Sequence, residues 1–180
     1  MEAISKINAR EKGSDELYLV VDTPRGSRNK FKYDEELHLF KLGSVLPAGA
    51  VFPFDFGFIP RTRAEDGDAL DVVLLMDEST FVGCLVLARL VGVIEAEQTK
   101  NAETVRNDRL IAVAAQSPTH KEIKALSQLS GTFVEEIEHF FVSYNQFKGR
   151  EFKPLGRFGP ERAEQLLEAG LRNYQDQTRS

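Results

Sequence analysis

Residues 51–76 read VFPFDFGFIPRTRAEDGDALDVVLLM, and two patterns in this stretch decide the fold. Its first half packs four phenylalanines around Pro53 and Gly57, which is more typical of a buried core than of a binding site. Its second half places three aspartates within six residues, directly before the apolar run Val72–Met76. The stretch therefore predicts a buried strand that is entered from an acidic turn.

The three aspartates, Asp66, Asp68 and Asp71, are the sharpest chemical signal in the chain. Their carboxylates repel one another, and each is poorly tolerated beside an apolar strand unless a cation neutralises it. Mg²⁺ takes oxygen ligands, uses few carboxylates and keeps several waters. A calcium loop does not fit, because the sixth position from Asp66 is Asp71 instead of glycine and the twelfth is Asp77 instead of glutamate. A solvated acidic turn that caps the strand is the alternative interpretation.

The first two-thirds of the chain reads as short strands separated by glycine, proline and aspartate. Such frequent turns are typical of a small barrel or sandwich. Asp34-Glu35-Glu36 predicts the turn of a hairpin between two of these strands. The expected strands are Leu17–Asp22, Asn29–Tyr33, Leu37–Lys41, Val72–Met76, Cys84–Glu95 and Leu110–Ala114.

The last third of the chain changes to a helical period. Thr132 with Glu135 matches a capping box, and apolar residues follow at helical spacing. A shorter helix is expected at about residues 119–129, and Pro160 is expected to begin a final helix. We predict one α+β domain over residues 1–180, a compact antiparallel barrel with helices packed on its outside and a helical C-terminal third.

The composition argues against several classes of protein. Of 180 residues, 42% are hydrophobic and 28% are charged, which is ordinary for a globular chain. The formal net charge of −5 disfavours a nucleic-acid partner, because such proteins carry a basic surface. No apolar run approaches the roughly 20 residues that span a bilayer, so no membrane partner is expected. The single cysteine, Cys84, cannot form an internal disulfide, which favours a cytoplasmic location.

A family resemblance rests on the order Phe-Pro-x-x-Phe-Gly-Phe-Ile-Pro-Arg-Thr from Phe52, followed by Glu-Asp-Gly-Asp-x-Leu-Asp-Val from Glu65. This order resembles the soluble inorganic pyrophosphatases of the β-barrel family, of which the chain looks like a divergent member. The resemblance implies an OB-like barrel with flanking helices, Mg²⁺-dependent hydrolysis of pyrophosphate to two orthophosphates, and a homo-oligomer, with dimer and hexamer both open. Further segments follow in the family's order at residues 17–22, around Lys30, at 109–113 and at 139–144.

The resemblance also implies a role for each matching residue. Asp68 would be the catalytic residue, acting as general base or orienting the attacking water. Asp66 and Asp71 would hold the metal, with Asp22 as a further ligand. Tyr144 would bind phosphate, although a core aromatic fits its spacing equally well. The implied substrate-binding residues are Lys30, Arg109 and Tyr144.

Several residues depart from the family pattern, namely Asp22, Lys32, Ser44, Phe52, Phe56, Ala69 and Asn145. Lys32 stands where an outer metal usually has a carboxylate, so we expect it to displace that ion and to offer its charge to the substrate. The alternative is a shifted hairpin register that points Lys32 to solvent. Ser44 and Asn145 each replace a phosphate-binding cation, and Lys148 or Arg150 is expected to compensate.

The remaining metal carboxylates are ambiguous. Strand alternation, counted back from Arg109, places Asn107 on the site face and turns Asp108 away, unless a bulge brings Asp108 in as a ligand. The other metal ligand expected from this loop is either Glu103, or it is missing because Asn101 stands in its place.

Three alternative functions stay open from the sequence: a protein that binds metal and a phosphate compound with little or no turnover, a hydrolase of another phosphoanhydride, and an OB-type nucleic-acid module. The net acidity argues against the last.

Overall fold

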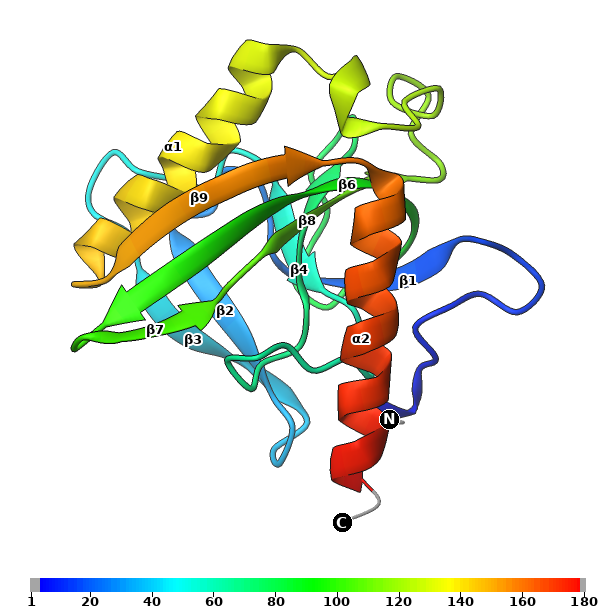
Figure 1. Ribbon diagram of the computed structural model, residues 1–180, viewed down its shortest axis with the longest axis horizontal. Helices are drawn as coiled ribbons and strands as arrows, with labels where there is room; N and C mark the ends of the chain where they lie inside the picture. The colour runs from blue at the N-terminus through cyan, green and yellow to red at the C-terminus, as the bar shows by residue number, and fades with distance from the viewer. Residues whose placement is uncertain (1–3, 179–180) are drawn as a thin grey trace.

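The computed structural model describes residues 4–178, and its centre is a closed ring of five strands (Figure 1). Each strand pairs with the next, and the last pairs with the first, so the barrel predicted from the short strands is confirmed. In ring order the strands are β1 (Leu17–Thr23), β4 (Asp55–Phe58), β5 (Asp71–Leu75), β8 (Arg109–Ala114) and β6 (Leu85–Lys100).

One pair in the ring corrects the expectation of a wholly antiparallel barrel. Strands β5 and β8 run parallel, with Val72 opposite Leu110, whereas the other neighbours are antiparallel. Parallel neighbours need a crossover connection, and here the chain passes through β6 and β7 (Glu103–Arg106) before it returns as β8. The sequence pattern shows where strands lie but carries no signal for this direction.

Strand β6 is the longest element of the sheet, with 16 residues. Its first part pairs with β1, its middle with β8, and its end with β7 and β9 (Glu151–Phe158). The predicted strand stops at Glu95, because most of the residues beyond it are polar. In the structure β6 continues to Lys100, past a register shift between Glu95 and Ala96 in its pairing with β9. The C-terminal third is mainly helical, as expected, but β9 is a strand within it that the sequence did not predict.

The ring closes tightly where β4 meets β1. A Cβ atom at Gly57 would lie 2.1 Å from the backbone oxygen of Val20, closer than real Cβ contacts come. Glycine is therefore required here by the approach of two backbones. This contact fixes the strand that carries Phe56 and Phe58 toward the pocket described below.

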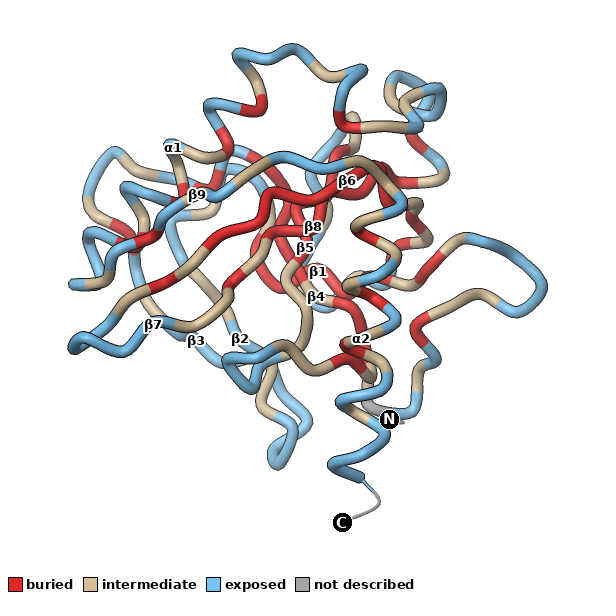
Figure 2. Tube along the Cα trace, in the orientation of Figure 1, coloured by how far each residue is buried: buried red, intermediate tan, exposed pale blue. Residues whose placement is uncertain are grey.

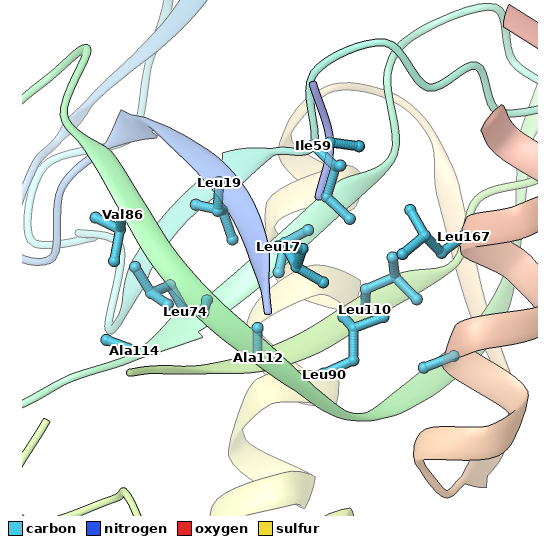
Figure 3. Close-up of a cluster of buried hydrophobic side chains, with 14 of the residues drawn as sticks. Leu17, Leu19, Ile59, Leu74, Val86, Leu90, Leu110, Ala112, Ala114 and Leu167 are labelled. Atoms are coloured by element: carbon cyan, nitrogen blue, oxygen red, sulfur yellow. The ribbon is translucent and has the colours of Figure 1, made fainter. Parts of the chain in front are cut away.

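Side chains alternate along the strands and so form two hydrophobic cores, one on each face of the sheet. Figure 2 shows the buried residues concentrated in β1, β4, β5, β6 and β8. One core includes Leu17, Leu110 and, from the last helix, Leu167, which points toward Leu110 in Figure 3. The other contains Phe52, Phe54 and Phe56 with α1, so the first half of the quoted stretch is core, as expected.

Two helices pack on the ring (Figure 1). Helix α1 (Gly131–Phe147) lies along β9, and α2 (Pro160–Thr178) packs on β6 and begins at the expected proline. Helix α1 begins after Ser130, two residues before the capping box expected at Thr132. The Ser130 side chain makes no capping hydrogen bond. Neither helix in the described part of the chain has the length and apolar character to cross a membrane.

The helix expected at about residues 119–129 does not form. Residues 115–130 make turns, with one 3-10 turn at Leu126–Gln128. The guanidinium of Arg89 donates to the carbonyl oxygens of Lys121 and Ile123, at 2.7 and 3.0 Å. Because Arg89 satisfies these two carbonyl groups, they need no hydrogen bonds within a helix. Helix propensity depends on local sequence and does not reveal such a distant partner.

Strands β2 (Asn29–Asp34) and β3 (Leu39–Val45) form a separate hairpin beside β1. Lys32 is opposite Lys41, and a register shift lies between Lys30 and Phe31. The hairpin is the predicted one, with its second arm moved by two residues at the start. It carries Lys30 and Lys32 to the pocket.

Candidate active site

A pocket of about 410 Å³ opens where β1, the β2–β3 hairpin, β8 and α1 meet the acidic stretch before β5. Carboxylates and cationic side chains are interleaved around it, so positive and negative charges lie within one small volume. The lining acids are Asp22, Glu35, Asp66, Asp68 and Asp71, and the lining bases are Lys30, Lys32, Arg63, Arg109, Lys148 and Arg150.

The structure brings together most of the residues that the sequence assigns to a site. Two of the assigned residues, Asp108 and Glu103, do not line the pocket. Those that do are Asp22, Lys30, Lys32, Asp66, Asp68, Asp71, Arg109, Tyr144 and Lys148.

Asp22 and Lys30 form an ion pair at the back of the pocket. The Lys30 Nζ atom lies 2.5 Å from Asp22 Oδ1 and 4.5 Å from the centre of the Phe56 ring. Burial raises the pKa of Asp22, which is 5% exposed, and the Lys30 charge opposes that rise. Phe56 therefore supplies a surface on which the ammonium rests, a role that needs no phenolic hydroxyl.

Arg109 and Asp71 form a second pair, at 2.8 Å. Arg109 is only 4% exposed, and its guanidinium carbon lies 4.7 Å from the centre of the Phe141 ring. Its Nη1 atom also donates to the Asp108 carbonyl at 3.0 Å and to the side chain of Asn107. Burial raises the pKa of Asp71, and Arg109 opposes the shift.

Lys32 and Asp68 form the third pair, near the mouth of the pocket. The Lys32 ammonium donates to both carboxylate oxygens, at 2.8 and 2.9 Å. The two side chains keep 55% and 57% of their area exposed. Lys32 thus faces the aspartates, and the register shift between Lys30 and Phe31 does not turn its side chain away from the pocket.

Asp66 completes the acidic group. Its Oδ1 atom accepts a hydrogen bond from the Asp68 backbone amide, at 3.1 Å. Desolvation by the surrounding chain raises the pKa of Asp66, and the charges of Asp71 and Asp68 add to the rise. A carboxylate with a raised pKa beside two others gains most from a nearby cation.

The carboxylate oxygens of Asp66, Asp68 and Asp71 line the pocket, and oxygen atoms are the ligands that a hard divalent ion prefers. Within residues 4–178, however, no three His, Cys, Asp or Glu side chains converge as ready metal ligands. A metal that keeps several of its own waters, as Mg²⁺ does, suits such an incomplete set.

Tyr144 and Lys148 approach the pocket from α1. Lys148 Nζ donates to the Tyr144 hydroxyl oxygen at 2.5 Å and lies 4.5 Å from the ring centre. Burial raises the pKa of Tyr144 to about 12, so the phenol keeps its proton at neutral pH. Burial, with the nearby charges of Arg150 and Lys30, lowers the pKa of Lys148 to about 8.

Several buried donors in this pocket have no acceptor. Within the described residues, the Nε atoms of Arg63, Arg109 and Arg150 are buried without a hydrogen-bond partner, and all three side chains line the pocket. An unpaired buried donor is costly, so such groups usually await a ligand or water. Together with the lysines they fit an anionic ligand.

Asp108 and Glu103 were expected from the sequence as metal ligands, but neither lines the pocket. Asp108 accepts hydrogen bonds from the Ala96 amide at 2.9 Å and from Arg106 at 2.8 Å, outside the pocket. Strand alternation holds, and Asn107 lines the pocket in its place. Glu103 is exposed at the start of β7.

Sequence reasoning did not assign Arg63, Glu35 and Gln98 to the site, although all of them line the pocket. Arg63 and Glu35 lie next to the quoted acidic stretch and in the predicted hairpin turn, so their positions gave a usable signal. Gln98 accepts a hydrogen bond from Asn107 Nδ2 at 2.9 Å. It lies in the part of β6 that the apolar pattern did not reach.

Comparisons with known proteins agree with this arrangement. The model of the inorganic pyrophosphatase family matches residues 19–175. An inorganic pyrophosphatase of Synechocystis is 33% identical over 171 residues, covering 95% of this chain and 98% of that protein. One from Haloferax volcanii is 32% identical and covers 90% of each chain.

Solved structures show the same similarity. The inorganic pyrophosphatase from Thermus thermophilus superimposes with a TM-score of 0.88 at 31% identity, covering 97% of this chain and 99% of that one. The inorganic pyrophosphatase from Helicobacter pylori gives a TM-score of 0.85, also at 31% identity, over 94% and 99% of the two chains.

Proposed function

This chain belongs to the inorganic pyrophosphatase family, and from that premise we propose how its pocket hydrolyses pyrophosphate to two orthophosphates. The enzyme is a diphosphatase, a hydrolase of one phosphoanhydride bond. The observation that carries the assignment of the site is the pocket itself, which the carboxylates of Asp66, Asp68 and Asp71 line together with the cationic side chains of three lysines and three arginines.

We propose Mg²⁺ as the cofactor, held by Asp66 and Asp71, with Asp22 close by. The ion would neutralise phosphate charge and acidify a bound water. The raised pKa values of Asp66 and Asp71 support this choice, because a cation relieves the cost of keeping both groups charged.

The protein's own groups then divide the remaining work. Asp68, at the mouth of the pocket, accepts the proton of the attacking water. Lys30 and Arg109 sit on aromatic rings, which limits their motion and aims their charge at phosphate oxygens. Tyr144 keeps its proton at neutral pH and can donate it in a hydrogen bond to a phosphate oxygen. Lys148 and Arg150 also line the pocket and add positive charge to it.

Metal and substrate selectivity test this function together. With Mg²⁺ we expect fast phosphate release from pyrophosphate and much slower release from ADP or tripolyphosphate, because donors converge within a pocket of about 410 Å³. Ca²⁺ should support turnover poorly, since its larger and looser shell fits a Mg²⁺ site badly. Equal rates in the two metals, or faster release from ADP, would contradict the proposal.

The pKa of Lys148 predicts an alkaline limb in the pH profile. If the charged ammonium binds phosphate, kcat/KM should fall as pH rises through about 8, where Lys148 loses its proton. Lys148→Arg keeps the charge and should move this limb to higher pH, whereas Lys148→Ala should raise KM by about tenfold or more, as expected for one charge-assisted contact.

Lys153→Arg is the matched control, because Lys153 is in the same segment but does not line the pocket. All variants share the titration of pyrophosphate itself, which cancels in the comparison. An alkaline limb that is identical in wild type and Lys148→Arg would rule out Lys148 as its origin.

A cytoplasmic location and a homo-oligomeric state are part of the same proposal. The single Cys84 supports a reducing compartment. Leu39, Leu42 and Val45 on β3 stay exposed and are large and apolar, which supports self-association.

A further inference from the structure

We call Asp66, Asp68 and Asp71 the aspartate cluster; at the pocket mouth this cluster contacts the ammonium of Lys32, whose side chain is more than half exposed. We propose that Lys32 is a built-in competitor of the divalent ion for this cluster, so that the pocket binds its ion more weakly than the same carboxylates would alone. The inference rests on the proposed function only in taking the aspartate cluster as the place where the ion binds.

The hydrogen bonds between Lys32 and Asp68 place the ammonium where an ion would approach the carboxylate. The ammonium of Lys32 bonds both oxygens of Asp68, at 2.8 and 2.9 Å, and so covers the carboxylate edge that a metal or a metal-bound water would contact. A protonated lysine has three donors and no acceptor, so it cannot serve as a ligand beside the ion. Within residues 4–178 the structure gives its third donor no partner, which leaves that donor available to a phosphate oxygen.

The two ion pairs that Asp22 and Asp71 make in the pocket differ from this one in burial. Lys30–Asp22 keeps 15% and 8% of its side-chain areas exposed, and Arg109–Asp71 keeps 5% and 29%. Both cations also rest on aromatic rings. Lys32 and Asp68 are more than half exposed, so water can replace their bonds and the pair can open. Lys32 is therefore the cation that an incoming ion can move.

Charge gives the expected size of the effect. A lysine about 5 Å from a divalent ion repels it even at the dielectric constant of water, and removing that charge should tighten ion binding by roughly tenfold at low salt. Salt should shrink the difference, because the pair is exposed.

The experiment is a calorimetric titration of Mn²⁺, as a Mg²⁺ substitute, into substrate-free full-length protein at low salt. Lys32→Gln should bind the ion about tenfold more tightly than wild type. Lys41→Gln is the matched control, since Lys41 lies opposite Lys32 on the hairpin, pairs with Asp34 at 2.6 Å and is 57% exposed. It removes the same charge outside the pocket and should change the affinity less than about twofold.

A double variant locates the effect. In an Asp68→Asn background the carboxylate that holds Lys32 beside the ion is gone and the lysine can turn away, so Lys32→Gln should tighten ion binding clearly less than it does in the wild-type background. Equal affinities for wild type and Lys32→Gln would overturn the inference, as would an equal gain in Lys41→Gln or no Mn²⁺ binding by any folded variant. Because the titration contains no pyrophosphate, a tighter Lys32→Gln would support the competition even if hydrolysis were absent.

Discussion

Replacing Asp68 with asparagine is expected to lower kcat for pyrophosphate hydrolysis by about 10²–10⁴-fold, the usual contribution of general acid–base catalysis. Asparagine keeps the shape of the side chain and can still accept a hydrogen bond from Lys32, but it cannot take a proton from water. The exposed position of Asp68 at the pocket mouth means that the fold should be unaffected. Phosphate release under saturating Mg²⁺ and pyrophosphate measures the effect.

Asp34→Asn is the control for this variant. Asp34 also pairs with an exposed lysine of the hairpin, Lys41, but lies outside the pocket lining. It should keep near-wild-type turnover. A kcat for Asp68→Asn within about threefold of wild type would show that the proton leaves by another route.

Replacing Arg109 with methionine is expected to cause the largest loss of stability among the pocket residues. Methionine fills the space between Phe141 and Phe152 but leaves the carboxylate of Asp71 without its partner. Breaking a buried pair costs 3–5 kcal/mol, and because Asp71 keeps 29% of its side chain exposed, we expect about 3 kcal/mol at neutral pH. Urea denaturation measures the free energy of unfolding.

The pH dependence of that loss identifies its cause. Burial already raises the pKa of Asp71, and losing Arg109 should raise it further. A carboxyl group whose pKa is higher in the folded state than in the unfolded state destabilises the fold when the pH is above the folded-state pKa. Below the unfolded-state pKa the group is protonated in both states, so it does not affect stability. The penalty of Arg109→Met should therefore shrink on acidification, and Asp71→Asn should remove most of it at neutral pH. A penalty that stays constant with pH and persists in the double variant would point to lost packing instead.

Periodicity was enough to predict the barrel, because its strands are short and apolar and end at turn residues. Leu17 and Leu110 are buried, as their apolar runs predict, and the side chains of β8 alternate between the two cores. The same alternation placed Asn107 in the pocket and Asp108 outside it. These features depend on near neighbours in the chain, which a sequence displays directly.

The features that were missed depend on distant partners. Arg89 holds the carbonyl groups that a helix at residues 119–129 would have used. Strand β9 is defined by its pairing with β6, since Pro154 and Gly156 weaken the strand signal of its own residues. The contact of Lys32 with Asp68 joins residues 36 positions apart. The resemblance placed Lys32 near the metal site, and only the fold shows which carboxylate it covers.

Whether this pocket hydrolyses pyrophosphate with a divalent cation is decided by counting the orthophosphate that purified, folded protein releases from a known amount of pyrophosphate. With Mg²⁺ we expect two orthophosphates for each pyrophosphate consumed, and no release above the uncatalysed rate once EDTA removes the metal. Protein that stays folded and binds Mg²⁺ yet releases no orthophosphate would contradict this function.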